Sequence, residues 1–166
     1  YLETENQVKR FIELIGEKQA YMSGHSYDEA VAMKAVEAIC RKYDIPWKYE
    51  QKLGLLRPSP MWYAPPAGEK AFSKERFSSA DYQRSIDVVN FIVEDKGHIL
   101  KNKYSLLRMH VGYTDSDLYQ MSTFHDIRPI EMSALCDSRV KKWVEDNHIE
   151  LINYRDFFKE IPFCWD

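Results

Sequence analysis

The chain has 166 residues, of which 45% are hydrophobic and 14% aromatic, and its formal net charge at pH 7 is −3. This length is most simply that of one domain with a real core, and the composition excludes a disordered chain. The mild acidity argues against a protein that binds nucleic acid through its overall charge, but it leaves room for one local basic groove.

The cysteines and the hydropathy of the chain indicate an intracellular protein. Cys40, Cys136 and Cys164 are scattered, odd in number and form no CxxC pair. They therefore indicate neither a zinc site nor a disulfide framework, and a reducing cytoplasm is the default expectation. No apolar run approaches the length of a membrane span, and no signal peptide is recognisable.

The first half of the chain predicts two helices followed by a strand and an irregular loop. An apolar stripe predicts a helix over residues 3–22, in which Gly16 weakens the middle. Ser26-Tyr-Asp-Glu29 forms a capping box that opens a second helix, which runs to about Tyr43. Residues 47–53 alternate as a strand does, whereas four prolines within residues 57–68 exclude a regular helix or a central strand.

The stretch over residues 79–97, SADYQRSIDVVNFIVEDKG, admits two local structures. A helix would be capped near its start and would stop at Gly97. Alternatively, residues 80–85 and 91–96 form two strands joined by a turn near residues 88–90. Its β-branched and aromatic composition suits a sheet better than a helix, so we favour the strands.

The strand interpretation brings three charged side chains together. Glu94 and Lys96 stand at i and i+2, so both side chains project from the same face of a strand. Asp81 would project from the neighbouring strand toward the same point. Two carboxylates can hold a Mg²⁺ ion, and an ammonium group can orient a water molecule or stabilise an oxyanion. This set predicts the hydrolysis of a phosphodiester.

At these residues the sequence resembles the PD-(D/E)XK nuclease superfamily. Asp81 and the run Glu94-Asp-Lys96 follow that superfamily's order, and Ser26-Tyr-Asp-Glu29-Ala matches a motif of its phage and mobile-element members. Two departures are the alanine before Asp81 and the charged Asp95 in the middle of the triplet, where an apolar residue is usual. A buried Asp95 would need a partner, because an unpaired carboxylate is costly to bury.

The resemblance implies a fold, an activity and a cofactor. The fold is α/β (α+β), with a mixed central sheet flanked by helices as in restriction endonucleases. One domain would comprise an N-terminal helix (1–25), a nuclease core (26–113) and C-terminal helices with a strand (114–166). The activity would be that of a Mg²⁺-dependent or Mn²⁺-dependent endonuclease, with Asp81 and Glu94 on the metal, Lys96 on the water or oxyanion, and Glu29 assisting.

The expected partner is nucleic acid, by preference DNA. Basic residues interleaved with aromatic residues can hold a nucleic-acid backbone and stack on bases, and the element after Lys96 commonly faces DNA in the resembled superfamily. The predicted contacts are Lys70, Lys74, Arg76, Lys101, Lys103 and Arg108. A homodimer is expected if the enzyme cuts both strands.

The remaining segments predict further helices, and alternatives to the nuclease stay open. A short helix is expected from Thr114 to Thr123, one or two helices over residues 130–147 with Asp137 as an internal cap, a strand over 148–154 and a terminal helix over 155–160. The alternatives are a non-catalytic nucleic-acid-binding protein, with a faint helix-turn-helix resemblance near Trp143, and an interaction or inhibitory protein.

Overall fold

The computed structural model describes residues 1–23, 30–47, 55–63 and 79–165 of the chain. The chain divides into two compact units, Tyr1–Gly54 with Leu151–Asp166, and Leu55–Glu150, and each is described by itself. The predicted single domain with divisions near residues 25 and 113 stays a prediction. Within the described residues, no helix is both long and apolar enough to cross a membrane.

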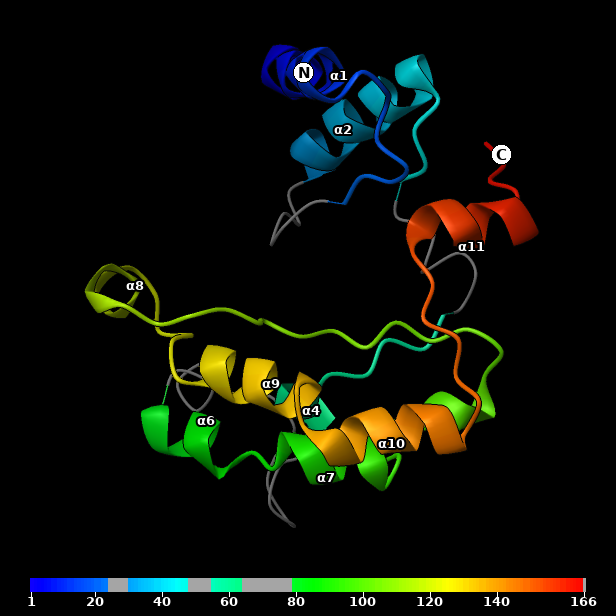
Figure 1. Ribbon diagram of the computed structural model, residues 1–166. Coiled ribbons are helices and arrows are strands. Elements are labelled where there is room, and N and C mark those ends of the chain that lie inside the picture. The colour runs from blue at the N-terminus through cyan, green and yellow to red at the C-terminus, as the bar shows by residue number, and fades with distance from the viewer. Residues whose placement is uncertain (24–29, 48–54, 64–78, 166) are drawn as a thin grey trace. The chain divides into compact units, whose positions relative to one another are not determined.

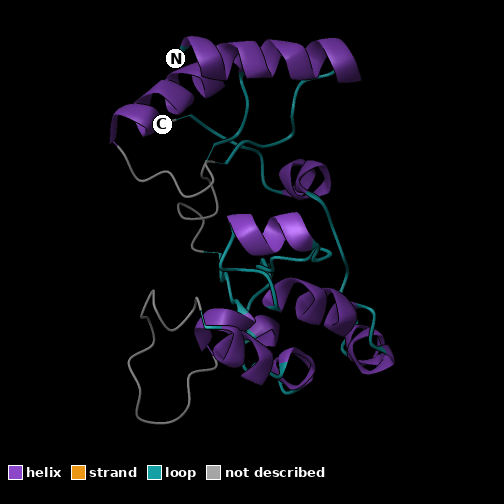
Figure 2. Cartoon of the chain, turned by 90° about the vertical axis from the view of Figure 1, so that its left-hand side faces the viewer, coloured by secondary structure: helices purple, strands orange, loops and turns teal. Residues whose placement is uncertain are grey.

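Helices make up the regular structure of both units (Figures 1 and 2). The first unit contains α1 (Leu2–Ile15), α2 (Ala30–Tyr43) and α11 (Tyr154–Glu160). The second contains α4 (Pro60–Tyr63), α6 (Ala80–Ser85), α7 (Val88–Val93), the 3₁₀ helix η1 (Ile99–Lys101), α8 (Ser116–Met121), α9 (Ile127–Leu135) and α10 (Ser138–Asp146). Strand pairing among the described residues is limited to two isolated bridges, Met22 with Trp47 and Leu56 with Ser105.

The predicted mixed central sheet is therefore wrong for the described residues. The stretch over 79–97 is neither a strand pair nor one helix, but two short helices that break at Ile86 and Asp87. The Ser79 hydroxyl caps the first helix at the Tyr82 N–H, and the Asp87 carboxylate caps the second at the Asn90 N–H. Burial of the apolar face of α7 overrides the β-branched composition.

The core of the second unit lies between α6, α7, α9 and α10. Val88, Phe91 and Ile92 are buried on α7 at a spacing of three and four residues, which is the spacing of one helical face. They pack in one cluster with Ala134 of α9 and Val140 of α10. An extended segment that includes Leu106 runs beside residues 56–58, where its N–H donates to the Leu56 carbonyl at 2.8 Å.

In the first unit, α1 and α2 are joined by an apolar cluster and by an ionic one. Val8 packs against Ile39 and Cys40 in a fully buried cluster. Beside it, Glu5 Oε1 accepts from Lys42 Nζ and from the Tyr43 hydroxyl, each at 2.9 Å, and Lys9 lies 3.0 Å away. Hydrogen bonds from Lys42, Lys9 and Tyr43 lower the pKa of Glu5 to about 2.

Two further predicted elements differ from the structure. The first helix ends at Ile15, because Gly16 adopts a left-handed conformation (φ 83°) and its N–H donates to the Ile12 carbonyl. The predicted strand over residues 148–154 is absent: its last residue, Tyr154, begins α11, and the six before it are irregular.

Candidate active site

The structure places the residues predicted for the metal site on the surface of the second unit. Asp81 lies exposed in the first turn of α6, and Glu94 occupies the C-cap position directly after α7. Lys96 Nζ lies 2.9 Å from Glu94 Oε2, and both side chains are about half exposed, at 50% and 54%. Glu94 and Lys96 form a surface ion pair in the turn after α7, and no strand positions them.

Asp95, the unusual middle residue of the triplet, caps the turn that follows α7. Its two carboxylate oxygens accept the N–H groups of Ile99, at 2.6 Å, and Leu100, at 3.1 Å. The next turn needs Gly97, because a Cβ atom there would lie 2.6 Å from the Cβ of Pro58. The charged triplet is therefore a turn with its own cap rather than the end of a strand.

The structure describes only some of the predicted nucleic-acid contacts, and it does not describe the assisting Glu29. Lys101 and Lys103 are exposed, and Arg108 is half-buried in the extended chain, where its N–H donates to the Pro58 carbonyl. Glu29, Lys70, Lys74 and Arg76 lie outside the described residues. Among the residues that are described, no group of three histidine, cysteine, aspartate or glutamate side chains could hold a metal ion. The participation of these residues in a site, and the Mg²⁺ or Mn²⁺ cofactor, stay predictions.

A different set of polar side chains converges where α9 begins. Asp126 is 6% exposed, and its Oδ1 accepts from the Tyr119 hydroxyl at 2.7 Å and lies 2.9 Å from His125 Nδ1. Arg84 Nε lies 2.8 Å from Asp126 Oδ2 as an ion pair, without the geometry of a hydrogen bond. The side chains that meet here thus come from α6, from α8 and from the turn before α9. We call Arg84, Tyr119, His125 and Asp126 the Asp126 cluster.

The Asp126 cluster holds a charged carboxylate against an imidazole. The hydrogen bond from Tyr119 is the main factor that lowers the pKa of Asp126 against the opposing effect of burial, and His125 and Arg84 add to it. The same bond raises the pKa of Tyr119. The centroids of the His125 and Tyr119 rings lie 4.3 Å apart, and the His125 side chain is 15% exposed. A histidine held by a carboxylate in this way is suited to carry protons.

Gln83 fixes the turn that presents the Asp126 cluster. Its side chain is fully buried; Oε1 accepts the Ile127 N–H at 3.0 Å, and Nε2 donates to the Thr123 carbonyl at 2.6 Å. From the other side, the Thr114 hydroxyl donates to the His125 carbonyl at 2.8 Å. The backbone on both sides of His125 is therefore anchored by side chains from other elements.

One turn further along α9, Glu131 places a second carboxylate in the interior. It is fully buried, and one of its oxygens accepts the backbone N–H of His110, whose ring Nδ1 lies 3.8 Å from it. Oε1 has no hydrogen-bond partner among the described residues. Burial raises the pKa of Glu131 to about 7, although the His110 N–H and the charge of Arg128 oppose the shift.

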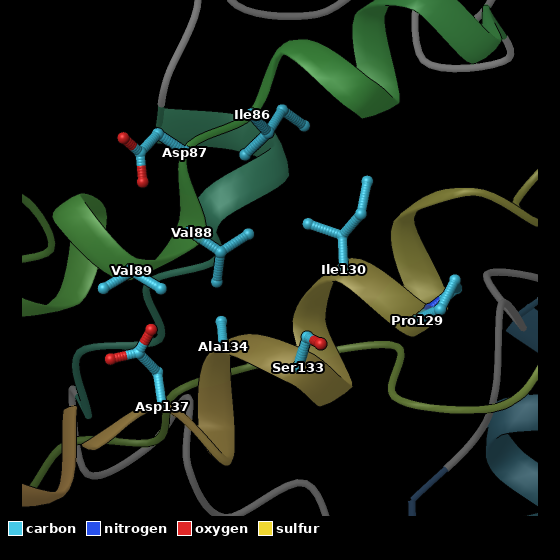
Figure 3. Close-up of a pocket in the computed structure, with 9 residues that line it drawn as sticks. All are labelled: Ile86, Asp87, Val88, Val89, Pro129, Ile130, Ser133, Ala134 and Asp137. Atoms are coloured by element: carbon cyan, nitrogen blue, oxygen red, sulfur yellow. The ribbon is translucent and has the colours of Figure 1, made fainter. Parts of the chain in front are cut away.

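Another face of α9 borders a pocket of about 440 Å³. In Figure 3, Val88 of α7 faces Ile130 and Ala134 of α9 across it. Asp87 and Asp137 also line it, but each caps a helix, and Asp137 is paired with Arg139 at 2.8 Å. The pocket is mainly apolar and lacks an imidazole, so it suits the hydrocarbon part of a ligand better than a reaction.

Sequence reasoning missed the Asp126 cluster and Glu131. The pair His125-Asp126 has no motif partner in the sequence, since Arg84 and Tyr119 reach it only through the fold. Glu131 did carry a signal, because it stands in the apolar stripe formed by Ile127 and Ala134. A carboxylate on the buried face of a helix indicates a specific partner or a functional role.

Comparison with known proteins points away from nucleases. No protein-family model and no solved structure matches the chain. Carbohydrate deacetylase 2 of Listeria innocua serovar 6a is 25% identical over 166 aligned positions, which cover 96% of this chain and 60% of that protein. A carbohydrate deacetylase of Thermoanaerobacter pseudethanolicus is also 25% identical, over 92% of this chain and 57% of that protein. The chain thus spans about three fifths of the length of these curated relatives.

These relatives overturn the predicted nuclease. The resemblance to the PD-(D/E)XK superfamily was wrong, and so were the endonuclease and DNA-binding functions drawn from it, because the chain is similar along nearly its whole length to proteins named as deacetylases. The non-catalytic alternatives are not supported either. The short Glu-Asp-Lys motif gave a false match, since its residues form a capped turn after a helix. The predicted homodimer stays a prediction.

Proposed function

We propose that the chain belongs to an enzyme that removes acetyl groups from carbohydrate. The observation that carries this proposal is the extent of the similarity: two proteins named as carbohydrate deacetylases, from different bacteria, align with 96% and 92% of the chain. Deacetylation is a hydrolysis, so it needs a group that takes a proton from water and gives one to the leaving nitrogen or oxygen.

Within this proposal, His125 is the group that carries the proton. Its Nδ1 faces the Asp126 carboxylate at 2.9 Å, which favours the tautomer with the proton on Nδ1 and leaves Nε2 as the basic nitrogen. Nε2 would take a proton from the water that attacks the acetyl carbonyl. It would then return that proton to the sugar nitrogen or oxygen as its bond to the carbonyl carbon breaks and acetate leaves.

The other members of the Asp126 cluster have supporting roles. Asp126 stabilises the imidazolium that forms when His125 accepts the proton, because its own pKa is lowered and it stays charged. The side chain of Arg84 is 61% exposed while its guanidinium contacts Asp126, so it can also reach a ligand oxygen. A positive charge near the attacked carbonyl stabilises the oxyanion that develops there.

Acetate release from a panel of sugars tests the proposal. The 166-residue chain is incubated with mono- and disaccharides that carry N-acetyl or O-acetyl groups, and acetate is measured by proton NMR. We expect release from at least one class of acetylated sugar and none from acetylated lysine, which controls for unspecific amide hydrolysis. No release from any acetylated sugar by the folded chain contradicts the proposal.

A further inference from the structure

The first unit contains a pocket of its own, of about 420 Å³. It lies between the segment that follows α1, the end of α2 and the C-terminal segment. Its lining residues are Lys18, Gln19, Ala20, Asp44, Pro46, Arg155, Phe158, Lys159 and Phe163. We call it the Phe158 pocket. Its size is within the range of small-molecule sites in proteins.

Aromatic rings form one wall of the Phe158 pocket. The rings of Phe158 and Phe163 meet edge to face, with centroids 6.1 Å apart. They belong to a longer series, in which Tyr154 packs on Phe158 and Trp165 packs edge to face on Phe163 at 4.7 Å. Each of these rings packs on at least one neighbour in the series. Such a wall offers flat apolar surface to a ligand with an apolar face.

Hydrogen-bond donors and hydrogen-bond acceptors surround this aromatic wall. Asp44 is fixed by Lys18, whose Nζ lies 2.9 Å away, and by the indole N–H of Trp165 at 3.3 Å. Gln19 also lines the pocket, and its Oε1 is buried without a hydrogen-bond partner among the described residues. A buried acceptor that lacks a donor is costly, so a ligand hydroxyl that donated to Gln19 would remove that cost once the amide turns toward the pocket.

The cations at the pocket are already neutralised. Lys18 pairs with Asp44, and Lys159 pairs with Asp156 at 2.9 Å. Arg155 pairs with Glu17, also at 2.9 Å. These groups can donate hydrogen bonds to a ligand, but they present no net positive charge that would select a multivalent anion. The pocket therefore combines an aromatic wall with donors and acceptors of hydrogen bonds.

We infer that the Phe158 pocket binds an uncharged sugar unit of the carbohydrate. A pyranose ring has an apolar face of C–H groups, which would stack on Phe158 and Phe163, and a rim of hydroxyl groups, which would bond to Gln19 and Lys18. The choice of ligand class rests on the proposed function. None of the residues that line the pocket belongs to the Asp126 cluster, so the inference concerns binding of the carbohydrate and not the reaction.

Binding to the whole chain tests this inference directly. N-acetylglucosamine and its disaccharide are titrated into the wild type and into F163A and Q19M, and binding is followed by saturation-transfer NMR. We expect binding to weaken about tenfold in F163A, the loss that corresponds to one aromatic contact. The matched control is F11A, which removes a ring of the same unit that is 37% exposed and does not line the pocket.

Three results would overturn the inference: no binding by the wild type, equal binding by all variants, or displacement of the sugar by inorganic phosphate. If F163A fails to fold, as judged by circular dichroism, the wild type with labelled phenylalanine decides. Nuclear Overhauser contacts from the sugar ring to Phe158 or Phe163 support the inference, and their absence contradicts it. Acetate release is measured on the same samples, so failure of the proposed function is seen separately from failure of the pocket.

Discussion

Gln83 of α6 accepts the N–H of Ile127, the first residue of α9, at 3.0 Å through its buried amide oxygen. Asp126 occupies the capping position of α9 but makes no capping hydrogen bond of its own. Its carboxylate contacts Tyr119, His125 and Arg84 instead. Gln83 therefore caps α9 in place of Asp126. The Asp126 carboxylate is then available to contact the other members of the Asp126 cluster.

Replacing Gln83 tests whether its side chain caps α9. In Q83A, the Ile127 N–H and the Thr123 carbonyl lose their partner in the interior, and we expect the free energy of unfolding to fall by about 2–4 kcal/mol. Urea denaturation measures the change. Q120A, at an exposed position of α8, is the control and should differ from wild type by less than about 0.5 kcal/mol. Equal effects of both variants would refute the buried cap.

Glu131 predicts a loss of stability as the pH rises. Its pKa is about 7 in the folded chain against an ordinary value of 4.5, so the folded state binds more protons than the unfolded state between these pH values. The destabilisation by the charged carboxylate is absent below pH 4.5, grows up to pH 7 and then stays constant, at no more than about 3–4 kcal/mol. E131Q should therefore be more stable than wild type at pH 8, with a smaller difference at pH 5.

Chemical denaturation at the two pH values measures the effect of E131Q. The control is E145Q, on the exposed side of α10, which should shift stability little and equally at both pH values. A difference between E131Q and wild type that does not change with pH would mean that the carboxylate of Glu131 is not titrating in this range.

For Glu5, in the first unit, we expect the opposite dependence of stability on pH. Its pKa is lowered to about 2 by Lys42, Lys9 and Tyr43, so its contribution to stability is complete above pH 4.5 and is lost as the pH falls toward 2. E5Q lacks the titrating group, and we expect its stability to change less than that of wild type between pH 5 and pH 2.5. E13Q, in an exposed pair with Arg10, should follow the wild type.

Gly97 predicts a steric effect in the turn after α7. An added Cβ would lie 2.6 Å from Pro58 Cβ, so G97A must move the turn away from the 58–61 segment. We expect destabilisation of about 1–3 kcal/mol, as for overpacked cores. G112A is the matched control, because its Cβ would meet Arg128 at an ordinary 3.7 Å. Thermal melting of both variants measures the difference. Equal melting temperatures would contradict the close approach of Gly97 to Pro58.

Local sequence signals predicted the helices with clear periodicity or caps. The helix that ends near Tyr43, the cap at Asp137 and the terminal helix near residues 155–160 are confirmed. The stretch over 79–97 was misread, because composition favoured strands while the spacing of Val88, Phe91 and Ile92 on one helical face decided the structure.

The candidate site was beyond the reach of local patterns for a physical reason. Arg84 and Tyr119 are 35 residues apart, and neither belongs to a motif with His125. Only the docking of α6 and α8 beside the start of α9 brings them to Asp126. By contrast, Glu94 and Lys96 are neighbours in the sequence, so their proximity reflects the turn and carries little information about function.

The most direct measurement compares acetate release by wild type, H125Q and H148N on the acetylated sugar that the panel selects. His148 is exposed and has a left-handed backbone (φ 54°) that asparagine tolerates, so H148N controls for the loss of a histidine. The account predicts a rate at least about 100-fold lower in H125Q, with H148N equal to wild type. Equal rates in all three proteins would show that the Asp126 cluster is not the site of deacetylation.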